Sequence, residues 1–167
     1  MVNFARLAVL LVTVIGCVGC DQVTKAAART YLSTGTTMSF FNDTLRLQHA
    51  ENRGGFLSIG ESLPTEARKI LFTFGGGVLV GGSIFWAVRS RRVNTIQTIG
   101  AALLCSGGLG NLIDRFIRDG YVTDFLNVGV GPLRTGIFNV ADFALLLGVA
   151  LLVLAGTGGE RHGLTNQ

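Results

Sequence analysis

Three long apolar runs constrain the fold of this 167-residue chain more than any other feature of its sequence. Residues 70–88 and 93–113 contain no charged side chain, and residues 137–156 contain only Asp142. Each run meets the roughly 20-residue length that a helix needs to span a bilayer. Only 14% of all residues are charged, whereas about a quarter is usual for a soluble domain. The sequence therefore predicts an α-helical integral membrane protein.

A further apolar stretch near the N-terminus predicts one more spanning helix, although its uncharged centre covers only residues 7–20. We expect residues 1–167 to form a single membrane-embedded domain of four transmembrane helices. The expected spans are about 4–30, 68–88, 93–113 and 137–156. Apolar and polar residues alternate at 44–48 and 122–126, which predicts two short strands of a small sheet at the membrane surface.

Four spans place both termini and the turn at residues 89–92 on one side of the membrane, and both long polar segments on the other. The arginine density of this turn indicates that its side is cytoplasmic. A plain count disagrees, because that side carries five of the Lys and Arg residues and the opposite side carries nine. We follow the turn and expect cytoplasmic termini.

Glycines are numerous in two of the predicted spans, and we expect them to allow close packing between helices. They are Gly75, Gly76, Gly77, Gly81 and Gly82 in the second span, and Gly107, Gly108 and Gly110 in the third.

Composition and motifs weigh against several functions. The pI of about 9.4 does not indicate nucleic-acid binding, because the basic residues are scattered over short loops; we expect phospholipid headgroups to be their partners. Val18-Gly-Cys-Asp21 is similar to a lipoprotein cleavage site, but three spanning segments follow it. Cys17 and Cys20 form a C-x-x-C, yet they lie in the middle of a predicted span rather than at an exposed helix start.

Polar residues gather at one end of the predicted bundle, where buried polar groups are costly and usually functional. Asp21 and Lys25 lie at the end of the first span. Asn111, Asp114 and Arg115 end the third span, and Asn139 and Asp142 begin the fourth.

Asp142 is the most informative of these residues, because it is expected about five residues inside the fourth helix, or roughly 7 Å along its axis. It could form a structural ion pair with Lys25 or Arg115, or it could act chemically with Asp124. Two carboxylates in a poorly solvated site share a proton. The ionised one can then activate water while the neutral one hydrogen-bonds the scissile carbonyl.

Other hydrolytic mechanisms lack the residues they need. The sequence contains no H-E-x-x-H zinc motif, and Ser106 lacks a G-x-S-x-G context. We therefore predict an aspartyl peptidase without a metal or another cofactor. Two other classes stay open at this point: a transporter in which Asp142 relays protons, and a structural subunit whose polar cluster joins helices.

Five boxes in the sequence resemble those of lipoprotein signal peptidase, also called signal peptidase II, from about residue 5 to residue 155. They are Asp21-Gln-Val-Thr-Lys25, Glu51-Asn-Arg-Gly-Gly-Phe56, Gly107-Gly-Leu-Gly-Asn-Leu-Ile-Asp-Arg115, Val122-Thr-Asp-Phe125 and Phe138-Asn-Val-Ala-Asp142. One departure is Gly55, where the family often has alanine, which could loosen that loop.

The resemblance implies that the signal peptide is cleaved before a diacylglyceryl-modified cysteine in the bacterial cytoplasmic (inner) membrane. It implies Asp124 and Asp142 as the catalytic pair, with Asn52 and Arg115 holding substrate backbone nearby. Other substrate-binding or site-supporting positions are Gly54, Gly108, Asn111, Asn139 and Ala141, and the structural polar positions are Asp21, Lys25 and Asp114.

The resemblance also implies a small extracytoplasmic sheet, an active site at the outer face and a mobile helix over that site. The expected partners are lipid-modified prolipoproteins, membrane phospholipid and cyclic peptide inhibitors such as globomycin, which would bind at the two aspartates. We expect no nucleic acid among the partners and a monomeric enzyme.

Overall fold

The computed structural model describes residues 4–33, 35–56, 59–90 and 93–160. The elements are, in chain order, α1 (Phe4–Tyr31), β1 (Thr37–Phe40), β2 (Leu45–Asn52), α2 (Thr65–Arg68), the π-helix η2 (Lys69–Phe74), α3 (Gly75–Arg89), α4 (Thr95–Ile117), β3 (Val122–Val130), β4 (Leu133–Arg134) and α5 (Val140–Glu160). Helices and a small sheet were both predicted, and both are present.

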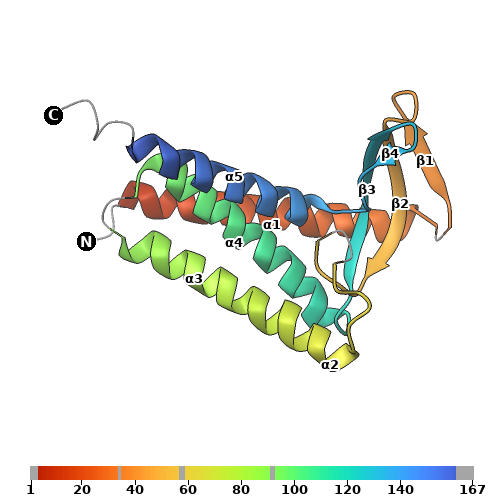
Figure 1. Ribbon diagram of the computed structural model, residues 1–167, viewed down its shortest axis with the longest axis horizontal. Helices are drawn as coiled ribbons and strands as arrows, with labels where there is room; N and C mark the ends of the chain where they lie inside the picture. The colour runs from red at the N-terminus through yellow and green to blue at the C-terminus, as the bar shows by residue number, and fades with distance from the viewer. Residues whose placement is uncertain (1–3, 34, 57–58, 91–92, 161–167) are drawn as a thin grey trace.

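The long helices form an elongated bundle with the sheet across one end (Figure 1). α4 lies at the centre and packs against α1, α3 and α5. The start of α1, the end of α3, the start of α4 and the end of α5 lie at the end away from the sheet. The two polar segments that the sequence analysis assigned to one side are therefore at the same end of the molecule.

Three helices of the described residues are long and apolar enough to span a membrane: Phe4–Tyr31, Thr65–Arg89 and Thr95–Ile117. Val140–Gly156 is a shorter apolar helix. α1 and α3 expose large apolar side chains, such as Ile15 and Phe85. Exposed apolar surface of this kind suits a lipid solvent, whereas α4 is mostly buried by its neighbours.

The sheet is antiparallel with the order β1-β2-β3-β4. Leu47 pairs with Leu126 and Ala50 pairs with Asp124, with a register shift between these two pairs. The predicted strands at 44–48 and 122–126 correspond to β2 and β3, although β2 begins one residue later, at Leu45. Both strands continue beyond the predicted C-terminal end. β2 ends at Asn52, and its pairing with β3 places Asp124 opposite Ala50, two residues before that end.

Most helix ends differ from the predicted spans by one to four residues, and two of them bear on the site. α5 begins at Val140 rather than at 137, because Phe138 still pairs with Leu126 as an extended residue. α4 continues to Ile117. Asp142 therefore lies in the first turn of α5, and the expectation that it is five residues inside the helix was wrong.

Most of the glycines in α3 do not lie at a helix contact. A Cβ atom added to Gly75, Gly77, Gly81 or Gly82 would meet nothing within 4 Å in the described part of the chain. Only Gly76 faces a neighbour, the Leu112 side chain. The packing role predicted for these glycines was therefore wrong for four of the five.

The glycines of α4 do lie at close contacts. A Cβ on Gly107 would be 2.2 Å from the carbonyl oxygen of Ala141 in α5, and one on Gly108 would be 2.4 Å from Val80 Cγ2 in α3. A Cβ on Gly110 would be 2.6 Å from Asp21 Oδ2. These glycines let α1, α3 and α5 approach the central helix.

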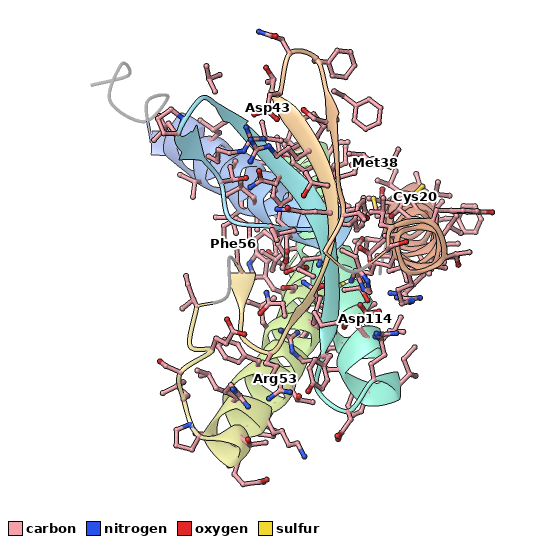
Figure 2. All side chains as sticks on the ribbon, turned by 90° about the vertical axis from the view of Figure 1, so that its right-hand side faces the viewer. Cys20, Met38, Asp43, Arg53, Phe56 and Asp114 are labelled. Carbon is pink, nitrogen blue, oxygen red and sulfur yellow. The ribbon has the colours of Figure 1, made fainter. Side chains whose placement is uncertain are left out.

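The polar segment between β2 and α2 lies to the left of the lower part of the sheet in Figure 2, where Arg53 and Phe56 are labelled. Its residues 59–62 form turns. Residues 57 and 58 lie outside the described residues. The mobile helix that the resemblance implies was predicted without residue bounds, so it stays a prediction.

Candidate active site

Eight of the buried polar side chains gather where the sheet meets the helix bundle. They come from α1, β2, α4, β3 and the start of α5, and each is at most 7% exposed. The set comprises Asp21, Lys25, Asn52, Asn111, Asp114, Asp124, Asn139 and Asp142. The structure thus brings together residues that are up to about 120 positions apart in the sequence.

Lys25 is the central cation of this cluster and is fully buried. Its Nζ lies 2.9 Å from Asp21 Oδ2 and 3.2 Å from Asp114 Oδ2. It also donates a hydrogen bond of 3.0 Å to Asn111 Oδ1. A buried charge needs such partners, because its desolvation is expensive.

The two carboxylates that flank Lys25 also connect backbone segments. Asp21 Oδ1 accepts a hydrogen bond of 2.9 Å from the Ala141 amide at the start of α5. Asp114 Oδ2 accepts one of 3.0 Å from the Thr123 amide in β3. Through these contacts α1 and α4 hold the two segments that carry Asp142 and Asp124.

Asn139 and Asp142 form a reciprocal cap at the start of α5. The Asp142 amide donates to Asn139 Oδ1 at 2.9 Å, and the Asn139 amide donates to Asp142 Oδ2 at 3.3 Å. The spacing is that of a capping box, in which residues Ncap and N3 satisfy each other's amides. Asp142 also accepts a bond of 2.8 Å from Asn111 Nδ2. Among the described residues, no cation lies within ion-pair distance of Asp142.

Asp124 lies in β3 and accepts one hydrogen bond at each carboxylate oxygen. Asn139 Nδ2 donates to Oδ1 at 2.6 Å, and Asn52 Nδ2 donates to Oδ2 at 2.9 Å. Asn139 Nδ2 also lies 3.1 Å from Asn111 Oδ1. The two aspartates are therefore connected through asparagine side chains within one network.

Burial raises the pKa of Asp124 to about 7, and the charge of Asp142 acts in the same direction. The amide donors from Asn52 and Asn139 oppose this shift in pKa, but they do not cancel it. A carboxyl group with such a pKa is partly protonated near neutral pH. When one carboxyl group holds a proton and its neighbour is ionised, the two can divide the roles of acid and base.

Asn52 and Arg115 shape the loop beside Asp124. Asn52 donates to Gly55 O at 2.9 Å and accepts from the Gly54 amide at 2.7 Å. Arg115 donates to Gly54 O at 2.7 Å, and its guanidinium lies 5.7 Å from the ring centre of Phe72. Gly54 is thus held from both sides, next to the carboxylate that Asn52 contacts.

The remaining predicted site residues serve packing and backbone contacts. Gly108 lies against Val80, and Ala141 is buried with its amide bound to Asp21. Gly55 does not lie free in its loop, because an added Cβ would be 2.6 Å from Phe72 Cε1. The aromatic ring fills the space that an alanine methyl group would take.

Sequence reasoning missed Gln22, Arg29 and Thr123. Gln22 Nε2 lies within 3.2 Å of oxygens on Asp21, Gly110 and Asp114. Arg29 donates to Thr123 Oγ1 at 3.0 Å, which connects α1 to β3. Gln22 and Thr123 lie inside two of the five boxes, so membership of a box was the available signal. No comparable signal marked Arg29.

Other chemistries find less support in the described residues. No group of three or more His, Cys, Asp or Glu side chains in them could hold a metal ion. Ser106 is buried in α4 and donates to the carbonyl oxygen of Ala102. Two buried carboxyl groups with one raised pKa suit acid–base hydrolysis by activated water.

Comparison with known proteins agrees with this chemistry. The family model described as signal peptidase (SPase) II matches residues 13–157. The lipoprotein signal peptidase of Desulforapulum autotrophicum is 35% identical over 134 residues, covering 80% of this chain and 82% of the relative. That of Mycobacterium tuberculosis is 35% identical over 169 residues, covering 94% of this chain and 78% of the relative.

A solved bacterial membrane enzyme has the same fold. Its structure, determined by the in meso method at 2.3 Å resolution, superposes with a TM-score of 0.85 at 23% identity. The superposition covers 99% of this chain and 96% of the other. The long family match and the 35% identical relatives together decide the family: this chain belongs to the signal peptidase II family and is an aspartic peptidase.

Proposed function

We propose that this peptidase removes the signal peptide from diacylglyceryl-modified prolipoproteins, with Asp124 and Asp142 as its catalytic pair. One observation supports the pair above all others: both buried carboxylates belong to one network, while the nearby cation Lys25 is paired with Asp21 and Asp114. Within the described part of the chain, no ion pair neutralises the proposed catalytic pair, which favours a shared proton.

In the proposed mechanism, the ionised aspartate takes a proton from water as the water oxygen attacks the scissile carbonyl carbon. The protonated aspartate hydrogen-bonds the carbonyl oxygen, on which negative charge develops. The C–N bond then breaks, and the leaving nitrogen, which becomes the amine of the lipidated cysteine, takes a proton from the pair. The pair thus returns to its singly protonated state.

Asn52, Asn111 and Asn139 act as positioning residues in this proposal. Their amide groups donate to the carboxylates and fix the directions of the remaining lone pairs. Arg115 holds the adjacent loop by donating a hydrogen bond to Gly54 O. The backbone of this loop can bind the substrate. Asp21, Lys25 and Asp114 hold the helices and β3 in register.

Apolar helices and the family together fit a protein of the bacterial inner membrane. We propose a single domain that crosses this membrane four times, with cytoplasmic termini and the sheet end outside. The 17 residues from Val140 to Gly156 extend about 25 Å at 1.5 Å per residue, and the end of α5 adds to this length. Cyclic peptides of the globomycin type would bind at the pair, and the enzyme would act as a monomer without a cofactor.

Substitution of the pair tests this proposal. Asp124→Asn and Asp142→Asn should each lower the cleavage rate of a diacylglyceryl precursor peptide by several orders of magnitude, because an amide cannot take the proton of water. The matched control is Asp119→Asn, which changes an exposed aspartate at the same end of the bundle. Product masses measure cleavage, and circular dichroism verifies that the variants are folded. Substantial cleavage by either folded variant of the pair would refute the assignment.

A further inference from the structure

A basic cavity lies between the start of the α2–η2 helical segment and the loop that follows α4. Its volume is about 210 Å³. Among the described residues that line it, four are cationic, namely Arg53, Arg68, Lys69 and Arg115, and one, Asp119, carries a carboxylate. The cavity therefore has an excess of positive charge that suits an anionic group.

The cationic side chains of this cavity keep capacity to bind a ligand. Arg115 Nε is buried without a hydrogen-bond partner among the described residues. Lys69 Nζ lies 3.9 Å from Asp119, at the limit of an ion pair. Arg68 donates to Glu61 O and Thr65 Oγ1, which uses only part of the five N–H donors of a guanidinium.

An apolar groove of about 710 Å³ continues from this cavity along the helices. Lys69, Thr73, Arg115, Asp119 and Gly120 line both spaces. Deeper in the groove, the lining residues are Ile70, Phe74, Gly77 and Val78 of η2 and α3, and Phe116 of α4. From Lys69 to Val78 the groove extends roughly 13 Å along the helix axis. A charged mouth above an apolar channel matches a headgroup with acyl chains.

The groove is separate from the candidate active site. Neither aspartate of the pair lines it, and Arg115 connects its lining to the loop beside Asp124 through Gly54 O. The mouth lies at the sheet end, where the apolar run of the α2–α3 segment begins. In a membrane-spanning chain this is the depth of lipid headgroups, where Lys and Arg attract anionic lipid.

We propose that this cavity and groove form a binding site for one anionic glycerophospholipid. The phosphate group lies among Arg53, Arg68, Lys69 and Arg115, and an acyl chain lies against Ile70, Phe74 and Phe116. The free N–H of Arg115 donates to the phosphate. The site depends on the membrane placement proposed above, but it does not depend on the assignment of the catalytic pair.

Native mass spectrometry of the full-length protein tests this site. The protein is released from detergent that contains equal amounts of phosphatidylglycerol and phosphatidylcholine, and the retained lipid is counted. The wild type should retain phosphatidylglycerol in preference. Arg68→Gln and Lys69→Gln should each reduce this retention by about fivefold, the effect expected for one basic residue at an anionic surface. Arg89→Gln, at the far end of α3, is the matched control and should behave as the wild type.

Three outcomes would overturn the proposal. One is equal retention of the two lipids by the wild type. Another is unchanged retention in both Arg68→Gln and Lys69→Gln. The third concerns a free anion: if inorganic phosphate raises the melting temperature as much as phosphatidylglycerol does, the apolar groove contributes nothing and the ligand is not a lipid. Peptidase activity is measured separately with the lipid-modified precursor, so loss of the lipid site and loss of catalysis remain distinguishable.

Discussion

Asn139 connects Asp142 with Asp124, because its polar groups bind both residues. Its backbone amide and Oδ1 cap Asp142, and its Nδ2 donates to Asp124 and Asn111. From the sequence, Asn139 and Asp142 were both placed at the start of the fourth span. The cap, in which Asp142 takes the N3 position of a capping box, was not predicted. The link from Asn139 to Asp124 depends on tertiary packing and could not be predicted from local sequence.

The raised pKa of Asp124 predicts how the cleavage rate depends on pH. A shared proton is needed for catalysis, and the pair loses that proton as the pH rises through about 7. The rate at saturating lipid-modified peptide should therefore fall on the alkaline side with an apparent pKa of about 7. Rates measured between about pH 5 and pH 9 test this. A flat profile up to the alkaline limit would contradict the role of Asp124.

The same shift in pKa should affect the stability of the fold. The pKa of Asp124 in the folded protein lies above its ordinary value of 3.8. Its contribution to stability is therefore full below about pH 3.8 and is lost as the pH rises through about 7. Asp124→Asn removes the titrating group and serves as the control. Its melting temperature should decline less between about pH 4 and pH 8 than that of the wild type.

The chain contains two lysines, Lys25 and Lys69. Their replacement gives a matched comparison of folding stability. Lys25→Met leaves Asp21 and Asp114 buried without their cation, so it should cost about 3–5 kcal/mol of folding stability. Lys69 is half exposed beside Asp119, and Lys69→Met should cost no more than about 1 kcal/mol. Denaturation of both variants in a neutral detergent measures the difference. Similar costs for the two substitutions would show that the buried cluster does not support the fold.

At the scale of elements, hydrophobicity predicted which segments are helical but not where they end. The apolar runs correspond to α1, the α2–α3 segment, α4 and α5. Helix ends depend on capping and pairing instead: Asn94 and Gln97 form a capping box at the start of α4, and the pairing of Phe138 delays α5. Glycine positions were misinterpreted for a related reason. The sequence shows that glycines are present, whereas only the packed structure shows which side of a helix contacts its neighbour.

The contact between α4 and α5 gives a prediction at this scale. A Cβ at Gly107 would lie 2.2 Å from Ala141 O and 2.9 Å from Leu145 N, and backbone atoms cannot move aside as a flexible side chain can. Gly107→Ala should therefore destabilise the protein by about 1–3 kcal/mol or more and displace the turn that carries Asp142. Gly81→Ala is the control, because its added methyl group meets nothing within 4 Å. Equal melting temperatures for the two variants would contradict the close contact between these helices.

For the whole molecule, the distribution of polar groups separates the three functions that the sequence left open. A proton relay needs ionisable groups through the depth of the membrane, whereas the buried carboxylates here lie together at the sheet end. Membership in a peptidase family decides against both the transporter and the structural subunit. Sequence boxes identified the residues that gather at this end, but the basic cavity beside α2 could not be predicted from them. Its lining comes from three separate segments, and only folding brings those segments together.

The orientation in the membrane is a prediction for the whole molecule. Single cysteines are introduced at Arg89 and at Asp119, which lie at opposite ends of the bundle, in a variant without Cys17, Cys20 and Cys105. A membrane-impermeant thiol reagent applied outside intact cells should label position 119 and leave position 89 unlabelled until the cells are opened. The arginine-rich turn near position 89 favours the cytoplasm for this end. The reverse pattern would show that the plain count of basic residues is the better guide. Labelling of both positions from outside would refute a membrane crossing by α4, which lies between them.

Substrate depth gives the last prediction. The candidate pair lies at the end of apolar helices, where a cysteine with two acyl chains would be held at the depth of the scissile bond. Such anchoring supplies binding energy of roughly 0.8 kcal/mol per buried CH₂ and fixes the register of the peptide. Misplacement by about 1 Å can cost on the order of a hundredfold in rate. The diacylglyceryl precursor should thus be cleaved at least about a hundredfold faster than the same peptide with an unmodified cysteine. Both peptides are compared at one concentration in one detergent, with Asp142→Asn as the blank. Equal rates would mean that the enzyme recognises the signal helix alone, and the proposed specificity for lipid-modified precursors would then be wrong.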